Sequence, residues 1–385
     1  TFLLEDSAGH IWIGTNDNGI SRFDPVRGTI VNFDDSAGPS NLIETNDGWS
    51  IYRESNSGWC AYATGDGLVW LSTQRDPIKV FKIDLNSNSI PLNDFGFVPT
   101  FYEEASGELW KGSGYSGTGL VLEDSSGVIQ KIYRHDPRNS KSLSNNTVRS
   151  IIKDSSGKLW IGTSFGLNEF ESSKEEFVRY LANPEDPSSL SSNDISSVFE
   201  DSRQNIWVGT SFDGLNILDR KTHKFKVYKT ESGDINTISG LEITAICEDK
   251  SGNIWVGCMN DGAGLNRFSH EDESFKRYLP GLSILSLLID ANEDLWVGTA
   301  IGLYRFDPVA DQFENTGITS NITLVTNDAD NNLWLYTSNG IIRYDPQNGN
   351  TLLFGEKNGV KGILQSNSWM IPYRKKDGTL LFATE

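Results

Sequence analysis

The chain has 385 residues, 37% of them apolar, which is ordinary for a soluble globular protein long enough to bury a large core. Its net charge of −19 argues against nucleic acid and anionic membrane surfaces as partners, although a local basic pocket for sulfated or uronic ligands stays possible. We find no transmembrane run and no signal peptide. Thr1 falls inside a predicted strand, which indicates a chain cut at both ends.

One phrase recurs along the chain, and we call it the tryptophan motif: Asp, two residues, Gly, one residue, Leu or Ile, Trp, Ile or Val, Gly, Thr. Copies begin at Asp6, Glu103, Asp154, Asp201, Asp249, Asp290 and Asp328. The motif tryptophans lie 38 (Trp296 to Trp334) to 50 (Trp110 to Trp160) residues apart, except for a double gap after Trp12. That gap predicts a copy in which Ala61 replaces the tryptophan. Near the end, Leu381 takes the same place, so the sequence predicts eight whole repeats and half of a ninth.

Each repeat is predicted to hold four strands, because four short runs rich in β-branched and aromatic residues are separated by turn residues. In the fifth repeat these runs are residues 195–201, 205–211, 214–220 and 224–230. Asp-x-x-Gly would form the first turn, with Gly at positive φ, and Asn205 and Asn332 suit a similar conformation. Four-stranded antiparallel units in series predict an all-β fold, a β-propeller, whose rings hold about four to eight blades. A β-solenoid is the alternative.

Residue types that could carry chemistry do not form a catalytic or metal-binding pattern in the sequence. We therefore predict no catalytic residue, no metal and no cofactor. His10, His135, His223 and His270 fall in turns or links, which favours surface histidines. Asp290, Asn292 and Asp294 resemble the opening of a calcium loop, as do Asp328, Asp330 and Asn332. The twelfth positions hold Ile301 and Asn339 in place of the closing Glu.

The three cysteines, Cys60, Cys247 and Cys258, are interpreted as free buried thiols. Cys247 and Cys258 are placed on neighbouring strands of one blade. Whether they form a disulfide depends on the strand register, and it stays open.

The links between blades carry a second recurring phrase, from His135, Asn183 and Glu231. These Ser- and Asn-rich links are expected to run from the outer strand of one blade to the inner strand of the next. They would end on the same face as the loops that follow the motif threonines, around the mouth of the channel. Those loops offer aromatic rings, amides and carboxylates, which suit a sugar ligand; solvated loop tips are the alternative. The candidate ligand-binding residues are Asn16, Asp17, Asn18, Tyr115, Phe165, Phe212, Asp213, Met259, Asn260 and Asp261.

The motif and the Asp-Pro…Ser-Leu-Ser-Asn links together resemble the two-component regulator propeller repeat. The resemblance implies blades commonly arranged as two seven-bladed rings in the periplasm. There they form the sensor part of inner-membrane hybrid histidine kinases, or of some diguanylate cyclases, and many are thought to sense glycans. In the family an immunoglobulin-like module, a membrane helix and signalling domains follow, and none is present in this sequence. The phrase from Gly359 resembles the closing blade, which predicts a ring boundary near residues 90–97; a single eight-bladed ring with a leftover hairpin also fits the count.

The predicted function is a non-enzymatic, periplasmic sensing region for an oligosaccharide-like ligand, without nucleic acid as a partner. A homodimer would form through the full-length receptor. The first alternative is an enzyme on a propeller scaffold, such as a polysaccharide lyase or glycosidase, which needs converging carboxylates. The second alternative is a protein-interaction scaffold, because the fold alone does not choose among these functions.

Overall fold

The computed structural model describes residues 2–5, 11–14, 20–33, 48–53, 59–64, 67–72, 100–113, 117–125, 128–260, 262–328, 330–354, 373–374 and 380–381. Every regular element in these ranges is a β-strand, as predicted. The chain divides into two compact units, Thr1–Asn93 with Phe354–Ile363 and Asp94–Leu353 with Leu364–Glu385. The ring boundary predicted near residues 90–97 lies outside the described residues.

The smaller unit contains a four-stranded and a three-stranded antiparallel sheet. The first sheet consists of β1 (Phe2–Glu5), β2 (Ile11–Gly14), β3 (Ile20–Asp24) and β4 (Thr29–Phe33). The second sheet consists of β5 (Gly48–Arg53), β6 (Trp59–Thr64) and β7 (Gly67–Ser72). Ala61, which replaces the motif tryptophan, lies in β6 opposite Tyr52 and Trp70.

The larger unit contains six four-stranded sheets, each made of four consecutive strands, and a terminal hairpin. The first three sheets are β8 (Thr100–Glu103), β9 (Leu109–Gly112), β10 (Leu120–Glu123), β11 (Ile129–Tyr133); β12 (Val148–Lys153), β13 (Leu159–Thr163), β14 (Gly166–Glu171), β15 (Glu176–Tyr180); and β16 (Ile195–Glu200), β17 (Ile206–Thr210), β18 (Leu215–Asp219), β19 (Lys224–Tyr228). The next three are β20 (Glu242–Glu248), β21 (Ile254–Met259), β22 (Gly264–Phe268), β23 (Phe275–Tyr278); β24 (Ile284–Ile289), β25 (Leu295–Thr299), β26 (Leu303–Asp307), β27 (Gln312–Asn315); and β28 (Ile322–Asn327), β29 (Leu333–Thr337), β30 (Gly340–Tyr344), β31 (Thr351–Phe354). The hairpin is β32 (Tyr373–Arg374) and β33 (Leu380–Leu381).

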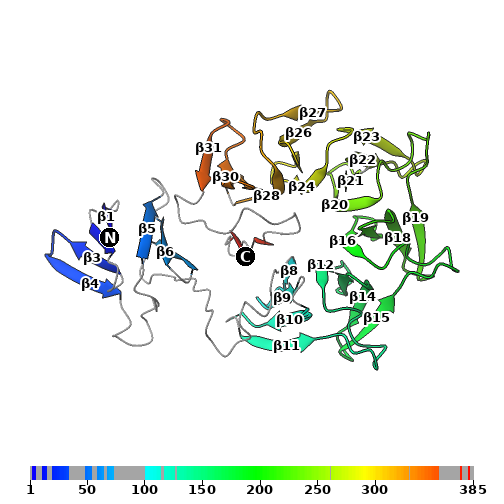
Figure 1. Ribbon diagram of the computed structural model, residues 1–385, viewed down its shortest axis with the longest axis horizontal. Helices are drawn as coiled ribbons and strands as arrows, with labels where there is room; N and C mark the ends of the chain where they lie inside the picture. Colours follow the sequence, from blue (N-terminus) through cyan, green and yellow to red (C-terminus); the bar gives the residue numbers. More distant parts are fainter. Residues whose placement is uncertain are drawn as a thin grey trace. The chain divides into compact units, whose positions relative to one another are not determined.

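The six sheets of the larger unit are the blades of a propeller. The first strands β8, β12, β16, β20, β24 and β28 contact one another in that order, and β32 contacts β8. Figure 1 shows these first strands on the inner side of the arc and the fourth strands on the outer side. The predicted antiparallel blades, with the Asp-x-x-Gly turn between the first two strands, are confirmed.

The tryptophan motif builds the wedge between two blades. Asp154 Oδ1 accepts the backbone N–H groups of Ser156 and Lys158, both at 2.9 Å, and Asp154 Oδ2 accepts the Trp160 indole N–H at 2.8 Å. Trp160, 2% exposed, packs against Ile195 of the next blade. The indole-to-carboxylate bond recurs at 2.8–2.9 Å in Asp201–Trp207, Asp249–Trp255, Asp290–Trp296 and Asp328–Trp334. One carboxylate thus accepts hydrogen bonds from both the turn backbone and the buried indole, so the motif has a structural rather than a catalytic role.

The prediction that Asn205 and Asn332 adopt positive φ is wrong. Positive φ falls one residue earlier, at Gln204 (67°) and Asn331 (62°), the position that Gly157 occupies in its blade. Asn205 instead donates its side-chain amide to Asp201 Oδ2 at 2.8 Å, and Asn332 donates in the same way to Asp328. The asparagines therefore serve as a second donor to the motif carboxylate.

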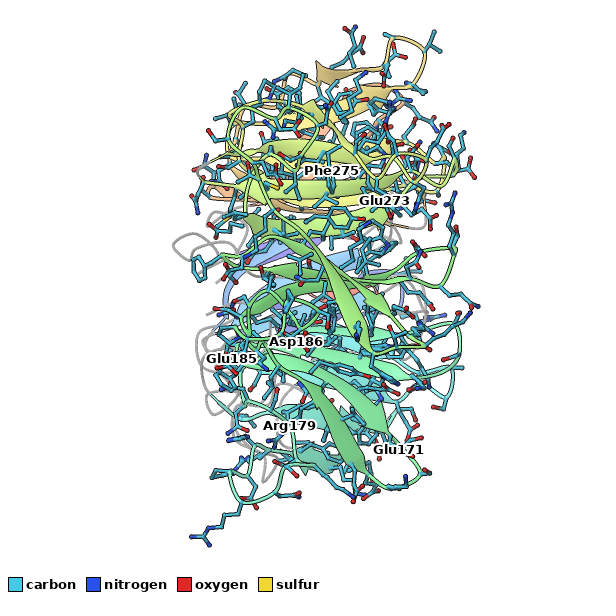
Figure 2. All side chains as sticks on the ribbon, turned by 90° about the vertical axis from the view of Figure 1, so that its right-hand side faces the viewer. Glu171, Arg179, Glu185, Asp186, Glu273 and Phe275 are labelled. Carbon is cyan, nitrogen blue, oxygen red and sulfur yellow. The ribbon has the colours of Figure 1, made fainter. Side chains whose placement is uncertain are left out.

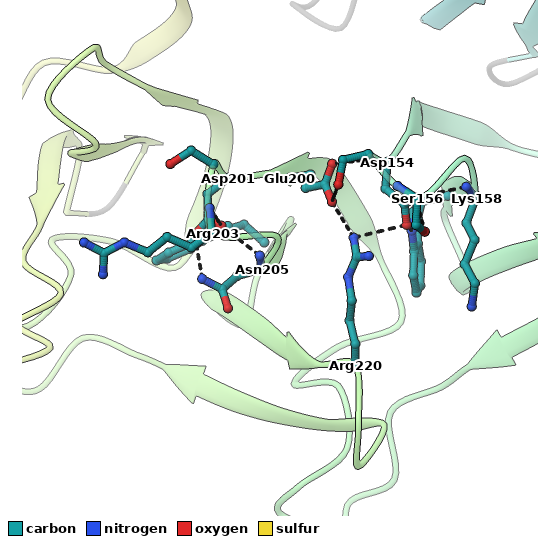
Figure 3. A network of polar contacts seen from close by, with 12 residues as sticks. Asp154, Ser156, Lys158, Glu200, Asp201, Arg203, Asn205 and Arg220 are labelled. Carbon is teal, nitrogen blue, oxygen red and sulfur yellow. Dashed lines mark hydrogen bonds and ion pairs between the residues drawn. The ribbon is translucent and has the colours of Figure 1, made fainter.

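Asp154 receives its second donor from a neighbouring blade. Lys158 stands where three of the other motifs have asparagine, and Arg220 Nη2 lies 3.1 Å from Asp154 Oδ2 and 2.7 Å from Glu200 Oε1 (Figure 3). Burial raises the pKa of Asp154, but bonds from Ser156, the Trp160 indole and the Lys158 amide, together with the Arg220 charge, outweigh it. The pKa of Asp154 therefore lies below its ordinary value. The cluster joins two blades at the face opposite the links.

The links close the wedges at the other face. Each inserts one apolar side chain between blades, and Leu143, Leu190 and Ile238 are at most 3% exposed. The serine that follows is fixed by an asparagine of the third strand: Asn168 Oδ1 accepts the Ser144 N–H at 2.9 Å, and Asn168 Nδ2 donates to Ser144 Oγ at 2.8 Å. The Ser-Leu-Ser phrase is thus a packing device that delivers each link to the next inner strand.

Candidate functional site on the loop face

The loops after the second strands and the ends of the links form one continuous face of the larger unit, which we call the loop face. Its described residues are 117–118, 145–147, 164–165, 192–194, 211–213, 240–242, 259–260, 262–263, 282–283, 300–301, 319–321 and 338–339. Backbone bonds join the two kinds of segment, from Ser164 N to Thr147 O (3.0 Å) and from Ser211 N to Asp194 O (3.0 Å). Figure 2 shows link residues Glu185 and Asp186 at the opposite edge of the blades from the turn residue Glu171.

The motif threonine shapes each of these loops. Thr163 Oγ1 donates to Gly166 O at 2.8 Å and accepts the Phe165 N–H at 3.1 Å. Thr210 Oγ1 likewise donates to Gly214 O at 2.9 Å and accepts the Asp213 N–H at 3.0 Å. Both threonines are fully buried, so the loop tips are held by the blade itself.

The predicted site residues fall in equivalent loops of consecutive blades. Phe165, between β13 and β14, is 50% exposed, and Phe212, between β17 and β18, is 64% exposed. Asp213 forms an ion pair with Lys229 at 3.3 Å. Asn260, between β21 and β22, has φ of 58° and donates to Glu242 Oε2. Asn16, Asp17, Asn18, Tyr115 and Asp261 lie outside the described residues.

The structure therefore gathers Phe165, Phe212, Asp213 and Asn260 on one face, along three neighbouring blades. No direct ring contact between Phe165 and Phe212 occurs in the described part of the chain, so they form separate platforms. Ile301, which the sequence did not suggest, occupies the same loop position two blades after Phe212 and is 54% exposed. The sequence signal for Ile301 is its position, because it is an apolar residue just before the loop glycine.

A polar cluster on the loop face was also missed from the sequence. Arg149 Nη1 donates to Asp194 Oδ1 and, at 3.0 Å, to Ser211 Oγ, which itself donates to Asp194 at 3.1 Å. The cluster joins β12 of one blade to the link and loop of the next. A charged residue at the second position of an inner strand was the available signal, because the next two blades have Ser196 and Thr244 there.

The acidic turns that resemble a calcium loop use their oxygens internally. Asp290 Oδ1 accepts the N–H groups of Asn292 (2.8 Å) and Asp294 (3.0 Å), and Oδ2 accepts the Trp296 indole (2.9 Å). Within the described residues no group of three or more His, Cys, Asp and Glu side chains is arranged to hold a metal. No helix in the same ranges could cross a bilayer.

The cysteines and histidines are accounted for by packing. Cys258 lies opposite Ile243 and Cys247 opposite Trp255, so the two are at different ends of the paired strands and both are free. Burial raises the pKa of the Cys258 thiol to about 11, which makes it unreactive. His135 and His223 bond to Leu143 O (2.9 Å) and the Tyr180 hydroxyl (2.8 Å) through Nδ1. His10 and Cys60 carry no described side chain.

The repeat geometry coincides with a known sequence family. The model for the two component regulator propeller matches residues 142–165, 189–212 and 237–260. Each match runs from the end of a link, through the first strand, the Asp-x-x-Gly turn and the second strand, into the loop face. These three segments match the two component regulator propeller repeat. The three matched repeats are those that carry Phe165, Phe212 and Asn260.

The chain is similar to several solved structures. Two are extracellular domains of hybrid two component systems from B. thetaiotaomicron, with 17% and 18% identity and TM-scores of 0.37 and 0.38; the alignments cover 97% and 100% of this chain and 62% and 55% of theirs. PorZ, a surface component of the type-IX secretion system of Porphyromonas gingivalis, has 15% identity and a TM-score of 0.52, covering 91% of this chain and 52% of its own. The chain thus spans between half and two thirds of these structures. Comparison with curated protein sequences gave no match.

Proposed function

We propose that this propeller is the ligand-sensing region of a two-component signalling protein, that it acts in the periplasm, and that it detects an oligosaccharide without altering it. The observation that carries the proposal is the run of three consecutive two component regulator propeller repeats, residues 142–260, whose loops form one face. Kinase or diguanylate cyclase activity, and a homodimer, would belong to the full-length receptor.

The chemistry of the loop face supports a sugar ligand. Phe165 and Phe212 expose aromatic planes suited to the C–H faces of a sugar ring, and neighbouring amides and hydroxyls suit its hydroxyl groups. Because Thr163 and Thr210 hold the loop backbones, little ordering would be needed on binding. The proposed ligand-binding residues on the loop face of the larger unit are therefore Phe165, Phe212, Asp213 and Asn260. Asn16 and Asp17 of the smaller unit, and Tyr115 and Asp261, lie outside the described ranges and stay predictions.

The test is a thermal melt of the chain with a panel of oligosaccharides, followed by mass spectrometry of each mixture. A ligand at about 100 times its Kd adds about 2.7 kcal/mol to the free energy of unfolding, which raises Tm by several degrees. Phe212→Ala should weaken binding by about threefold to tenfold, since an aromatic contact contributes about 0.5–1.5 kcal/mol. Val309→Ala is the matched control, because Val309 is 95% exposed in the β26–β27 turn, away from the loop face.

A stabilising sugar recovered intact, with binding weakened by Phe212→Ala but not by Val309→Ala, supports the sensor. A sugar recovered cleaved supports the lyase or glycosidase alternative instead. No shift with any sugar contradicts an oligosaccharide ligand and favours the protein-interaction alternative.

A further inference from the structure

The loop face is poor in available positive charge. Its described residues include three acids, Asp194, Asp213 and Glu242, and no Lys or Arg. The whole chain carries a net charge of −19, so the field around this face is set by carboxylates.

Among the described residues, three cations border the loop face, and each already has a partner. Arg149 is paired with Asp194, and its side chain is only 15% exposed. Lys229 is paired with Asp213 at 3.3 Å. Arg134 Nε donates to the Thr118 carbonyl at 3.1 Å. A sulfate or carboxylate would have to share these cations with the partners that they already contact, and recognition of such anions depends on charge-assisted hydrogen bonds from Arg or Lys.

Neutral hydrogen-bonding groups are abundant on the same face. Its described residues include side-chain amides and hydroxyls from five blades: Asn145, Asn146, Ser164, Ser192, Asn193, Ser211, Asn260, Ser283, Ser320, Asn321, Ser338 and Asn339. Amides and hydroxyls both donate and accept, which matches the alternating needs of sugar hydroxyls. Together with two exposed aromatic rings they form a surface suited to uncharged polyols.

We infer that the ligand of the loop face is a neutral oligosaccharide rather than a uronic or sulfated one, an inference that rests on the proposed sensor function. Its binding should depend little on salt, because no counterion needs to be released and no ion pair forms with the ligand. The ion pair between Arg149 and Asp194 acts as a specificity element, since it occupies the guanidinium that an acidic sugar would need.

The experiment compares two sets of hexasaccharides by calorimetry at 50 and 500 mM NaCl. The neutral set contains xylo-, manno-, galacto- and arabino-oligosaccharides, and the acidic set contains oligogalacturonide, hyaluronan and chondroitin sulfate oligomers. We expect binding from the neutral set only, with Kd changed less than twofold by salt. Binding confined to the acidic set and weakened by salt would overturn this inference and leave the sensor function intact. No binding in either set would overturn both.

A variant tests the specificity element directly. Asp194→Asn removes the carboxylate partner of Arg149 and should raise the affinity for the acidic set by about fivefold to tenfold. Glu171→Gln is the control, because it makes the same charge change at the opposite face (Figure 2). Gain of acidic binding by Asp194→Asn alone supports the inference. Equal gain in both variants would mean that net charge, rather than this ion pair, sets the preference, and would overturn the assignment of Arg149 and Asp194.

Discussion

Gly162, two residues after the motif tryptophan Trp160, should tolerate no side chain, because the next blade packs directly on it. Gly162 lies in β13 with ordinary backbone torsion, so its role is steric. A Cβ at Gly162 would lie 2.7 Å from Ile195 Cγ2, 3.2 Å from Val198 Cγ2 and 3.3 Å from Ile195 Cβ. Optimal carbon contacts are about 3.5–4.0 Å, so Gly162→Ala forces the two blades apart by close to 1 Å. Overpacking of this kind costs about 1–3 kcal/mol, partly offset by the roughly 0.5–1 kcal/mol that Ala gains over Gly in a strand.

A double-mutant cycle separates the clash from other effects. Ile195→Ala alone removes a fully buried side chain and should cost about 2–5 kcal/mol, but it also removes Cγ2, the closest atom to the new methyl group. Gly162→Ala should therefore cost about 1–2 kcal/mol less in the Ile195→Ala background than in the wild type. Urea denaturation followed by tryptophan fluorescence measures the free energy of unfolding of the wild type, the two single variants and the double variant. Gly281→Ala is the control: its φ of 79° strains an alanine, but Gly281 has open space around it, so the cost should show no coupling to Ile195. Additive costs for Gly162→Ala and Ile195→Ala would refute the steric reasoning.

Two further predictions concern the blade junctions. Arg220→Gln should lower the free energy of unfolding by about 1–3 kcal/mol, because it strips the second donor from buried Asp154. Adding Lys158→Asn should restore part of that loss by supplying the side-chain amide that three of the other motifs use, and no recovery in urea melts would contradict the shared role. Burial and then the Arg203 charge hold the pKa of His270 below its ordinary value, so the unfolded state binds its proton first and wild-type stability falls as pH drops from about 7 to 5. His270→Gln removes this proton uptake, so its unfolding free energy should decline less over that range; equal declines would show that His270 does not titrate differently on folding.

The fold was predictable because it is repeated. One unit of sequence, residues 195–230, gave strand positions that the structure confirms within a residue or two, since every copy must satisfy the same turn and the same wedge. The error at Asn205 has a physical reason. Asparagine suits both positive φ and side-chain donation to a carboxylate, and only the position of Asp201 Oδ2 decides between them.

Contacts between different repeats could not be predicted from the sequence of a single repeat. Arg220 stands 66 residues after Asp154, and nothing local marks it as the partner of that carboxylate. In the same way Arg149, Asp194 and Ser211 belong to three sequence segments that only the ring of blades brings together. Lys158 was the available clue, because it lacks the side-chain amide that three other copies donate to the motif carboxylate, which predicts a donor from another segment.

Folding and recognition are therefore divided along each repeat. The motif from Asp to Thr serves the structure of the blade. Its carboxylate binds the turn and the indole, its glycine packs against the next blade, and its threonine fixes the loop backbone. The residues between that threonine and the following glycine touch little of the core, and the tip changes from Phe165 to Phe212 to Ile301 to Asn339 without altering the blade. A propeller built this way could change its ligand by changing loop tips alone, so the chemistry of the loop face, and not the repeated motif, would carry the specificity of the proposed sensor.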